Sequence, residues 1–250
     1  MAIFLTPDKL RNAYGIEIKE KIIPDGSKNK PNRKLTSGVP QWVTIHNTDR
    51  IVTAAGTTQS EQYARATHNG NMSGVSVHYY IDDADCWQTL REDEIGYHAA
   101  DGYWGPGNCT TLAIEIIMDG SGKGYDKKAE DRGALLAATL LHRYGLGIER
   151  LTTHHRWSGK FCPAYILPHW TAFRDEVRRN LERLSGSGDA DGDGKITAAD
   201  ARLTLRAAVG LETPDPLSLA AADADGDGKI TAADAREILR RAVGEKEASA

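Results

Sequence analysis

Residues 112–118 read LAIEIIM, the clearest strand pattern in the chain. Every residue of this run is apolar except Glu115, as is typical of a strand buried within a sheet. A Gly-rich turn follows at residues 120–124, and residues 127–144 then carry leucines at helical spacing. We therefore expect this strand to belong to the main sheet and to be followed by a helix.

Other stretches continue this alternation of strand and helix. Residues 42–48, WVTIHNT, alternate apolar and polar side chains, and residues 75–82, VSVHYYID, are rich in β-branched and aromatic side chains. Further helices are expected at about residues 7–14, 58–69 and 168–184. The pattern predicts an α/β fold with a mixed central β-sheet flanked by helices, ending near Leu184.

The bulk composition excludes several classes of protein. The 250-residue chain has a formal net charge of −4 and no basic stripe, so nucleic acid is not an expected partner. No apolar run approaches the ~18 residues that span a membrane, so we expect no membrane insertion. Three cysteines are too few for a disulfide framework, which favours free thiols or a metal ligand.

The acidic residues gather near the end of the chain. From Asp189 onward there are 13 Asp or Glu and 8 Lys or Arg, against 22 and 23 in residues 1–188. DADGDGKITAADARLTLRAAVG (189–210) returns as DADGDGKITAADAREILRRAVG (223–244), a repeat with a period of 34 residues. SGSG at residues 185–188 is typical of a flexible linker. The predicted domains are residues 1–184, the linker 185–188, and a small all-α module of two loop–helix repeats at 189–250.

Each repeat fits the rule for a calcium-binding loop, with carboxylates at loop positions 1, 3, 5 and 12 and glycine at position 6. Alternate carboxylates on a loop turned by glycine can wrap Ca²⁺, and the backbone carbonyl at position 7 adds a further oxygen. We therefore expect two structural calcium ions. The expected ligands are Asp189, Asp191, Asp193, Lys195 and Asp200 in the first loop, and Asp223, Asp225, Asp227, Lys229 and Asp234 in the second.

Duplicated loops of this kind, each followed by a single helix and lacking the entering helix, resemble a type I dockerin over residues 189–244. Position 12 carries Asp in place of the Glu of an ordinary EF-hand. The resemblance implies a cohesin module on a scaffolding protein as the partner, with recognition at Ala198/Ala199 and Ala232/Ala233. The alternative is a calcium-stabilised tail without a partner.

Residues 153–163, THHRWSGKFCP, bring a histidine and a cysteine together. His154 and Cys162 lie eight residues apart, and Zn²⁺ favours imidazole nitrogen and thiolate sulfur. A surface loop with a buried free cysteine is the alternative. A catalytic zinc needs a third protein ligand, and His46 is the best placed because it ends a strand at a polar loop. The candidates for this third ligand are His46, His68, His78 and His98.

Glu115 is a second unusual residue, since its carboxylate interrupts an apolar strand. Burying a carboxylate there is costly unless the group is paired or used. Desolvation would raise the pKa of this carboxyl group toward the range of a general base. The alternative is a strand residue that faces solvent at a sheet edge.

Several short motifs occur in order along the chain: IHNT (45–48), SVHYYIDD (76–83), YHA (97–99), LAIEI (112–116) and HHRWSGKFCP (154–163). Together they resemble a zinc-dependent N-acetylmuramoyl-L-alanine amidase of the type 2 class. This class is found in bacteriophage endolysins and autolysins and is shared with peptidoglycan recognition proteins. The resemblance spans roughly residues 30–175.

The resemblance implies a zinc cleft with one catalytic zinc. The family's His-to-Cys spacing selects His154 over His155, and the tyrosine that some relatives place before the strand histidine is Val77 here. No tyrosine role is therefore transferred. The implied residues are the zinc ligands His46, His154 and Cys162, the catalytic Glu115, the polarising Lys160, and His98 as a substrate contact.

The implied reaction is hydrolysis of the amide bond between N-acetylmuramic acid and L-alanine in bacterial peptidoglycan. In the implied mechanism, Glu115 acts as general base on the attacking water, and Lys160 helps to stabilise the tetrahedral oxyanion beside the metal. Competing interpretations are a non-catalytic peptidoglycan receptor on the same fold, which typically lacks the zinc cysteine, and a scaffold-docking protein.

The first residues, MAIFLTPDKLRNAYG, lack the charged and apolar regions of a secretory signal. We therefore expect a protein that is made in the cytoplasm and acts on the cell wall after release, as phage endolysins do. An extracellular protein is the alternative. Either location fits the bacteriolytic, antimicrobial activity that the resemblance implies.

Overall fold

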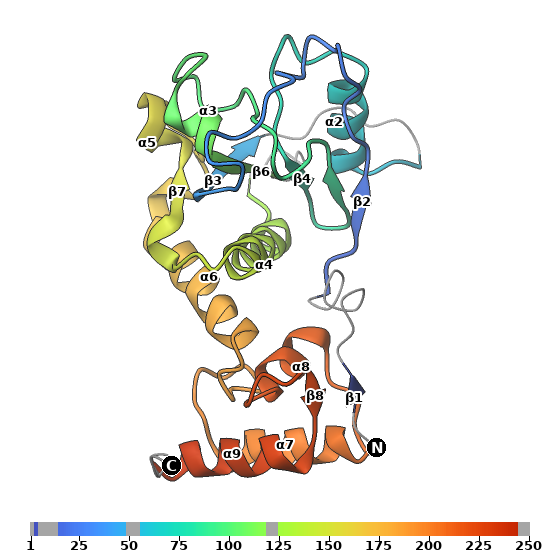
Figure 1. Cartoon of the computed structure of the whole chain (residues 1–250), viewed down its shortest axis with the longest axis vertical. Helices are drawn as coiled ribbons and strands as arrows, with labels where there is room; N and C mark the ends of the chain where they lie inside the picture. Colours follow the sequence, from blue (N-terminus) through green and yellow to red (C-terminus); the bar gives the residue numbers. More distant parts are fainter. Residues whose placement is uncertain (1–2, 5–14, 49–55, 119–124, 245–250) are drawn as a thin grey trace. The chain divides into compact units, whose positions relative to one another are not determined.

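The structure is a computed structural model that describes residues 3–4, 15–48, 56–118 and 125–244. The chain forms two compact units, residues 16–177 and residues 1–15 with 178–250 (Figure 1). Helix α6, Trp170–Leu184, begins in one unit and ends in the other, and the domain boundaries predicted at the linker stay predictions. The predicted helix at 7–14 and turn at 120–124 lie outside the described residues.

A six-stranded mixed sheet organises residues 16–177, in the order β2-β5-β4-β6-β3-β7. All neighbours pair in parallel except β4 and β5, which are antiparallel. The mixed central sheet expected from the sequence is thus confirmed. Its strands are β2 (Ile18–Glu20), β3 (Trp42–Thr48), β4 (Tyr79–Ile81), β5 (Cys86–Gln88), β6 (Thr111–Ile117) and β7 (Leu151–Thr153).

Three of these strands fall where the sequence predicts them. β3 matches its prediction, and β6 is displaced by one residue. β4 is much shorter than the predicted 75–82, because the preceding backbone bonds to other segments. The Ser76 N–H donates to the Tyr97 carbonyl, and the Val77 carbonyl accepts from the Thr89 hydroxyl.

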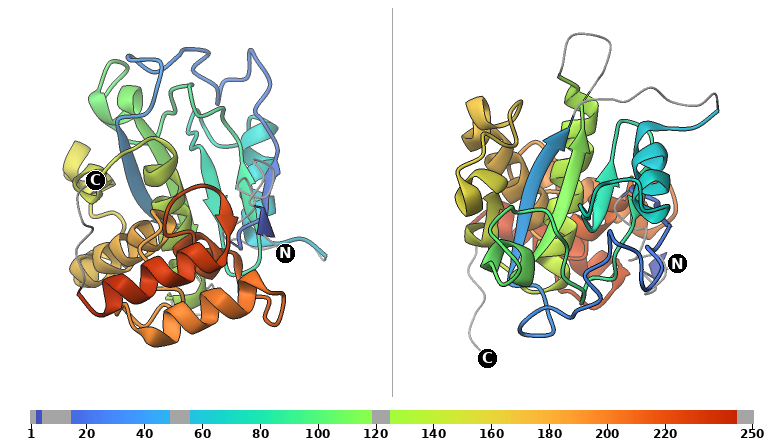
Figure 2. Two further views of the ribbon diagram at one scale, coloured as in Figure 1. Left: turned by 60° about the horizontal axis from the view of Figure 1, so that its bottom comes forward. Right: turned by 90° about the horizontal axis from the view of Figure 1, so that it is seen from above.

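Two helices cover opposite faces of the sheet. Side chains alternate between faces along a strand, and on β6 Ile117 packs with Tyr63 of α2 (Gln59–His68), whereas Ile116 lies against Gly133 of α4 (Lys127–Arg143). Figure 2 shows β3 and β6 side by side. Because Glu115 shares its face with Ile117, a functional site near Glu115 must lie on the α2 face.

Thr58 caps α2 by accepting from the Glu61 N–H, and Asp126 caps α4 by accepting from the Ala129 N–H. Both helices, and α6, confirm the predicted ranges to within two residues. Among the described residues no helix is long and apolar enough to cross a membrane. Two short helices, α3 (Pro106–Thr110) and α5 (His154–Ser158), were not predicted from the sequence.

In the second unit, α7 (Ala198–Ala208) and α9 (Ala232–Ala242) lie side by side, one from each repeat (Figure 2). A short helix, α8 (Pro216–Ala222), precedes the second loop, so the expected absence of an entering helix is wrong there. Asp215 caps this helix, with Pro216 at its first position, a signal that the sequence does contain. Strand β8 (Lys229–Ile230) pairs antiparallel with β1 (Ile3–Phe4).

Gly133→Ala tests the close approach of α4 to β6. In an exposed helix this exchange stabilises by about 1 kcal/mol. Here a Cβ would lie 2.3 Å from Ile116 Cδ1 and 2.7 Å from its Cγ1. We expect the free energy of unfolding to fall by about 1–3 kcal/mol because the core is overpacked. Urea unfolding followed by tryptophan fluorescence measures this, since all five tryptophans lie within residues 16–177.

The control is the same exchange in an Ile116→Ala background, which lacks both crowded carbon atoms. There Gly133→Ala should be neutral or stabilising. Equal losses of stability in the two backgrounds would contradict this account of the packing.

Candidate metal centre and catalytic cleft

The register of the sheet brings the predicted site together. His46 on β3 and Glu115 on β6 are direct partners across the parallel pair, so their side chains share one face. Thr153, the last residue of β7, pairs with Ile45. Helix α5 therefore begins with His154 at the same end of the sheet.

The loop after His154 turns the chain back on itself. Gly159 ends α5 in the left-handed conformation (φ +75°), which costs glycine little. The His155 N–H then donates to the Cys162 carbonyl over 2.9 Å. The eight-residue spacing thus allows Cys162 to return beside His154, while the His155 side chain stays exposed.

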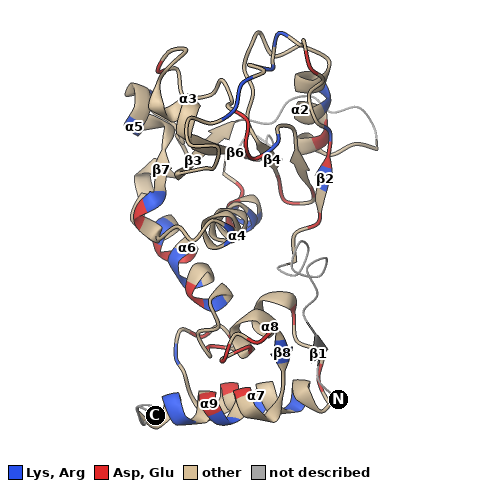
Figure 3. Cartoon of the chain, viewed as in Figure 1, with Lys and Arg blue, Asp and Glu red and all other residues tan. Residues whose placement is uncertain are grey.

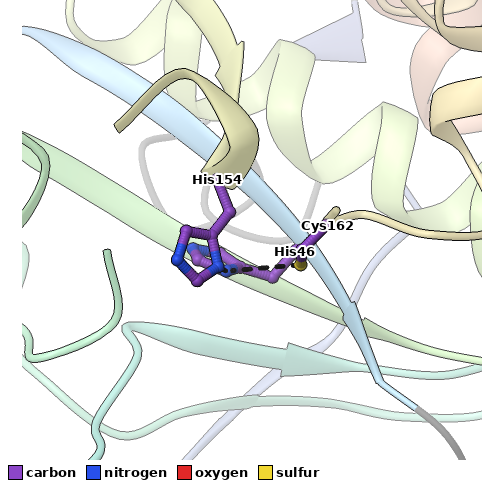
Figure 4. A group of neighbouring side chains, drawn as sticks. All are labelled: His46, His154 and Cys162. Carbon is purple, nitrogen blue, oxygen red and sulfur yellow. Dashed lines mark hydrogen bonds between the residues drawn. The ribbon is translucent and has the colours of Figure 1, made fainter. Parts of the chain in front are cut away.

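Three potential metal ligands converge at this point (Figure 4). The Nδ1 atoms of His46 and His154 are 3.1 Å apart, and Cys162 Sγ lies 3.9 Å from His46 Nδ1. All three side chains are buried, and their ligand atoms lie within 4.8 Å of one another. Two imidazole nitrogens and one sulfur are a donor set that suits Zn²⁺ and leaves one tetrahedral position open. The residues therefore fit the metal that the sequence predicts.

The pKa of each histidine in the cluster is lowered, which favours the neutral form that binds a metal ion. Burial lowers the pKa of His46 well below its ordinary value, helped by neighbouring His98 and His154, and burial also lowers the pKa of His154. Both rings are therefore neutral at pH 7, as metal ligands must be. Burial raises the pKa of the Cys162 thiol to about 11, so a metal ion must displace its proton on binding.

Glu115 stands beside this cluster, with its Oε2 4.0 Å from His46 Nδ1. β6 pairs with a strand on each side, so the edge-strand interpretation of Glu115 is wrong. Burial raises the pKa of the carboxyl group to about 8, and the positive charge of Lys160 partly opposes this shift. A carboxyl with that pKa can exchange a proton near neutral pH, as a general base must.

A single cavity of about 600 Å³ contains all the site residues that the sequence predicts outside the calcium loops. Lys160, on the exposed loop after α5, lines it. Its charge adds to the effect of burial in lowering the pKa of His46 and His154, and it partly opposes the rise in the pKa of Cys162. The residues shared by the cavity and the prediction are His46, His98, Glu115, His154, Lys160 and Cys162.

The structure separates the remaining histidine candidates. His78 is a core residue, with its Nδ1 accepting from the Ala113 N–H and its Nε2 bonded to the Glu94 carbonyl. His98 lines the cavity, yet its Nδ1 lies 3.0 Å from His46 Nε2 and its Nε2 lies 3.3 Å from Thr111 Oγ1. Both ring nitrogens of His98 thus face protein groups. His68 lies on α2, away from the cluster.

Sequence reasoning missed the residues that support the ligands. Asn108 Oδ1 accepts from the backbone N–H groups of His98 and Ala99, and the Ala99 carbonyl lies 3.0 Å from His154 Nε2. Trp157 Nε1 donates to Thr44 Oγ1, which ties α5 to β3. The partners in these contacts are 9 to 113 positions apart in the chain, beyond the spacing of helix and strand patterns, so such patterns could not reveal them.

In each calcium-type loop the carboxylates at positions 1, 3 and 12 come together. Figure 3 colours the ribbon red at the Asp and Glu residues of the chain, including those of this unit. Those at position 5, Asp193 and Asp227, lie outside these clusters and accept instead from the N–H of Lys195 and Lys229. Asp223 Oδ1 is buried and has no hydrogen-bond partner among the described residues, as expected of a cation ligand. The clusters are Asp189, Asp191 and Asp200, and Asp223, Asp225 and Asp234.

The fold and the site define an α/β domain that can hold a metal ion beside a largely buried carboxylate, joined to a duplicated loop–helix module. Residues 36–165, more than half of the chain, match the family model for N-acetylmuramoyl-L-alanine amidase. The chain belongs to this family. Residues 187–242 match the dockerin type I domain. Both resemblances drawn from the sequence are thus confirmed.

Curated relatives include two proteins of Bacillus subtilis (strain 168). N-acetylmuramoyl-L-alanine amidase CwlH is 34% identical over 162 residues, covering 65% of this chain and 61% of CwlH. N-acetylmuramoyl-L-alanine amidase XlyA is 33% identical over 159 residues, covering 64% of this chain and 50% of XlyA. The chain therefore spans about half to three-fifths of the length of these relatives.

Solved structures show the same relationship. The catalytic domain of XlyA matches with a TM-score of 0.56 at 32% identity, covering 65% of this chain and 99% of that one. The PlyG catalytic domain matches with a TM-score of 0.55 at 30% identity, covering 66% of this chain and 96% of that one. The similarity thus extends over nearly all of both catalytic domains.

Glu115→Gln in the metal-free protein tests the burial of this carboxyl group. With a folded pKa of about 8 against 4.5 unfolded, the native state binds more protons between these values, so stability must fall as pH rises through them. We expect a loss of roughly 1 kcal/mol per pH unit over this interval in the wild type. The glutamine variant lacks this contribution, which urea unfolding at pH 5, 7 and 9 measures.

Other groups titrate in both proteins, so the informative quantity is the difference between them. This difference should be small at pH 5 and should favour the variant increasingly toward pH 9. A difference that does not change with pH would show that Glu115 is not buried as described.

Proposed function

We propose that this protein is a zinc-dependent amidase that hydrolyses the bond between N-acetylmuramic acid and L-alanine in bacterial peptidoglycan. Its family and the names of its relatives support this reaction. The observation that carries the proposal is the His–His–Cys cluster beside Glu115 in one cavity. The proposed place of action is the bacterial cell wall, reached after release from the cell or by export.

His46 and His154, through Nδ1, and Cys162, through Sγ, would hold the metal ion. When bound, zinc supplies Lewis-acid polarisation of the scissile carbonyl and lowers the pKa of a water molecule. The buried positions of the three side chains hold the ligands in one arrangement and exclude bulk water. The cavity above them receives the amide of the substrate.

Glu115 acts as the proton carrier in this proposal. A cation in the cluster favours the ionised form of Glu115, so its carboxylate is available near neutral pH. It takes a proton from the attacking water and gives that proton to the nitrogen of the leaving L-alanine. Lys160 lines the same cavity, and its charge stabilises the negative charge that develops on the carbonyl oxygen when water adds to the carbonyl carbon.

We further propose that the dockerin-like module binds two calcium ions and docks onto a cohesin module. The convergent carboxylates and the unpartnered Asp223 oxygen support calcium binding. Thr197 and Thr231 form capping boxes with Asp200 and Asp234, so the position-12 carboxylates are fixed at the start of α7 and α9. The match to the dockerin family supports the partner.

The catalytic proposal predicts about one zinc ion per purified chain and loss of cell-wall clearing on chelation. Glu115→Gln should keep the zinc and lower the rate by about 10²–10⁴-fold, because only the proton carrier is removed. His154→Ala should lose both metal and activity. Metal analysis, together with the appearance of N-terminal alanine in treated peptidoglycan, measures these outcomes.

His155→Ala is the matched control, since this neighbouring side chain is exposed and should retain zinc and activity. Full activity of Glu115→Gln would contradict the mechanism. A wild-type protein that binds peptidoglycan without cutting it would instead be a receptor, and the proposed reaction would be wrong.

The second proposal predicts about two calcium ions per chain by calorimetric titration. Asp234→Asn should reduce the number to about one, because it removes a position-12 carboxylate from the second cluster. Glu212→Gln is the control: its carboxylate pairs with Arg206 outside the loops, so both ions should still bind.

Binding to type I cohesins should require calcium and should disappear when the ion is chelated. If the chain binds calcium but binds none of a broad panel of cohesins, the module is a calcium-stabilised tail without a cohesin partner. In that case the proposed partner would be wrong.

A further inference from the structure

The two histidines of the metal cluster are supported in different ways. His154 Nε2 faces the Ala99 carbonyl at 3.0 Å, and a carbonyl oxygen can only accept. The proton of His154 therefore lies on Nε2, and its Nδ1 is free to bind a metal ion. His46 has no such carbonyl: its Nε2 faces His98 Nδ1 at 3.0 Å, and its Nδ1 lies 3.1 Å from His154 Nδ1. Each of these neighbours can accept, so the contacts of His46 alone do not decide which of its nitrogens carries the proton.

The hydroxyl of Thr111 decides between these two arrangements. Thr111 Oγ1 lies 2.7 Å from the Gly107 carbonyl, which takes the single hydroxyl proton because it can only accept. Toward His98 Nε2, at 3.3 Å, Thr111 can therefore only accept. The proton of His98 must then lie on Nε2, and its Nδ1 presents a lone pair to His46.

We propose that Gly107, Thr111 and His98 form a tautomer relay that holds the proton of His46 on Nε2 and so keeps its Nδ1 free to bind the metal ion. His98 and Thr111 are thus positioning residues, where the sequence suggested a substrate contact for His98. The inference rests on the proposed zinc site. In general, partners of this kind orient a metal-bound histidine and raise its affinity.

The relay is buried along its whole length. Thr111 is fully buried and His98 is 7% exposed, so water does not compete for their hydrogen bonds. Burial also lowers the pKa of His98 well below its ordinary value, which keeps its ring neutral. A Cβ at Gly107 would lie 2.6 Å from both Ala99 Cβ and Trp157 Cγ, so the backbone that carries the terminal carbonyl is closely packed.

Asn108 links the two supports. Its Oδ1 accepts from the N–H groups of His98 and Ala99, at 2.9 Å each, and its Nδ2 donates to the Gly102 carbonyl. One amide side chain therefore positions both the ring that supports His46 and the carbonyl that supports His154. The positions of His46 and His154 therefore depend on the same side chain, Asn108.

The test is Thr111→Val, which keeps the shape of the side chain and removes the hydroxyl. Nitrogen-15 NMR of the metal-free wild type should show His46 protonated on Nε2 alone. In the variant His98 loses its acceptor, and a second His46 tautomer with the proton on Nδ1 should appear. Zinc affinity, measured by competition with a chelator, should fall by about 10- to 100-fold.

Thr111→Ser is the matched control, because it retains the hydroxyl and should restore the single tautomer and most of the affinity. A purely structural role of Thr111 would change unfolding without changing the tautomer. If Thr111→Val does not fold, His98→Leu removes the same support and should weaken zinc binding by a similar factor.

A metal-free wild type with the His46 proton on Nδ1 would overturn the relay without the need for any variant. Unchanged zinc affinity in both Thr111→Val and His98→Leu would also overturn it. None of these measurements uses peptidoglycan. A protein that meets these expectations but cuts no peptidoglycan would keep the relay and lose the proposed function.

Discussion

The pairing of β3 with β6 is the constraint on which the site depends. Its parallel register sets His46 opposite Glu115, and a shift by one residue would turn one of the two side chains to the α4 face. Gly133 secures that other face by letting α4 approach Ile116 closely. Packing on one side of the sheet thus maintains the geometry of the His–His–Cys cluster on the other.

The sequence revealed the parts of the site that depend on residue type and local spacing. LAIEIIM predicted an interior strand in which Glu115 is the one charged residue. The eight-residue spacing of His154 and Cys162 fits one short helix that ends at Gly159. The supporting residues could not be found in this way. Thr111 and Asn108 act through hydrogen bonds to His98, 13 and 10 positions away, and nothing in their immediate neighbours indicates that role.

The same division applies to the strands. β3 and β6 carry enough apolar residues to be recognised, whereas β2, β5 and β7 are three residues each and owe their conformation to pairing with longer neighbours. In the calcium-type loops the repeat predicted the carboxylates that come together, but not that Asp193 and Asp227 would accept hydrogen bonds from the loop backbone. Short elements are decided by tertiary context, which a local pattern does not contain.

The pairing of β1 with β8 has a consequence for the modular organisation of the chain. The second calcium-type loop completes its small sheet with residues 3–4 from the opposite end of the sequence. A C-terminal fragment released at the linker would leave the edge of β8 unpaired, and an open strand edge invites association with other chains. The dockerin-like module is therefore built from two separate segments of the sequence. A transplanted module needs residues 3–4 as well as the C-terminal repeats to keep β8 paired.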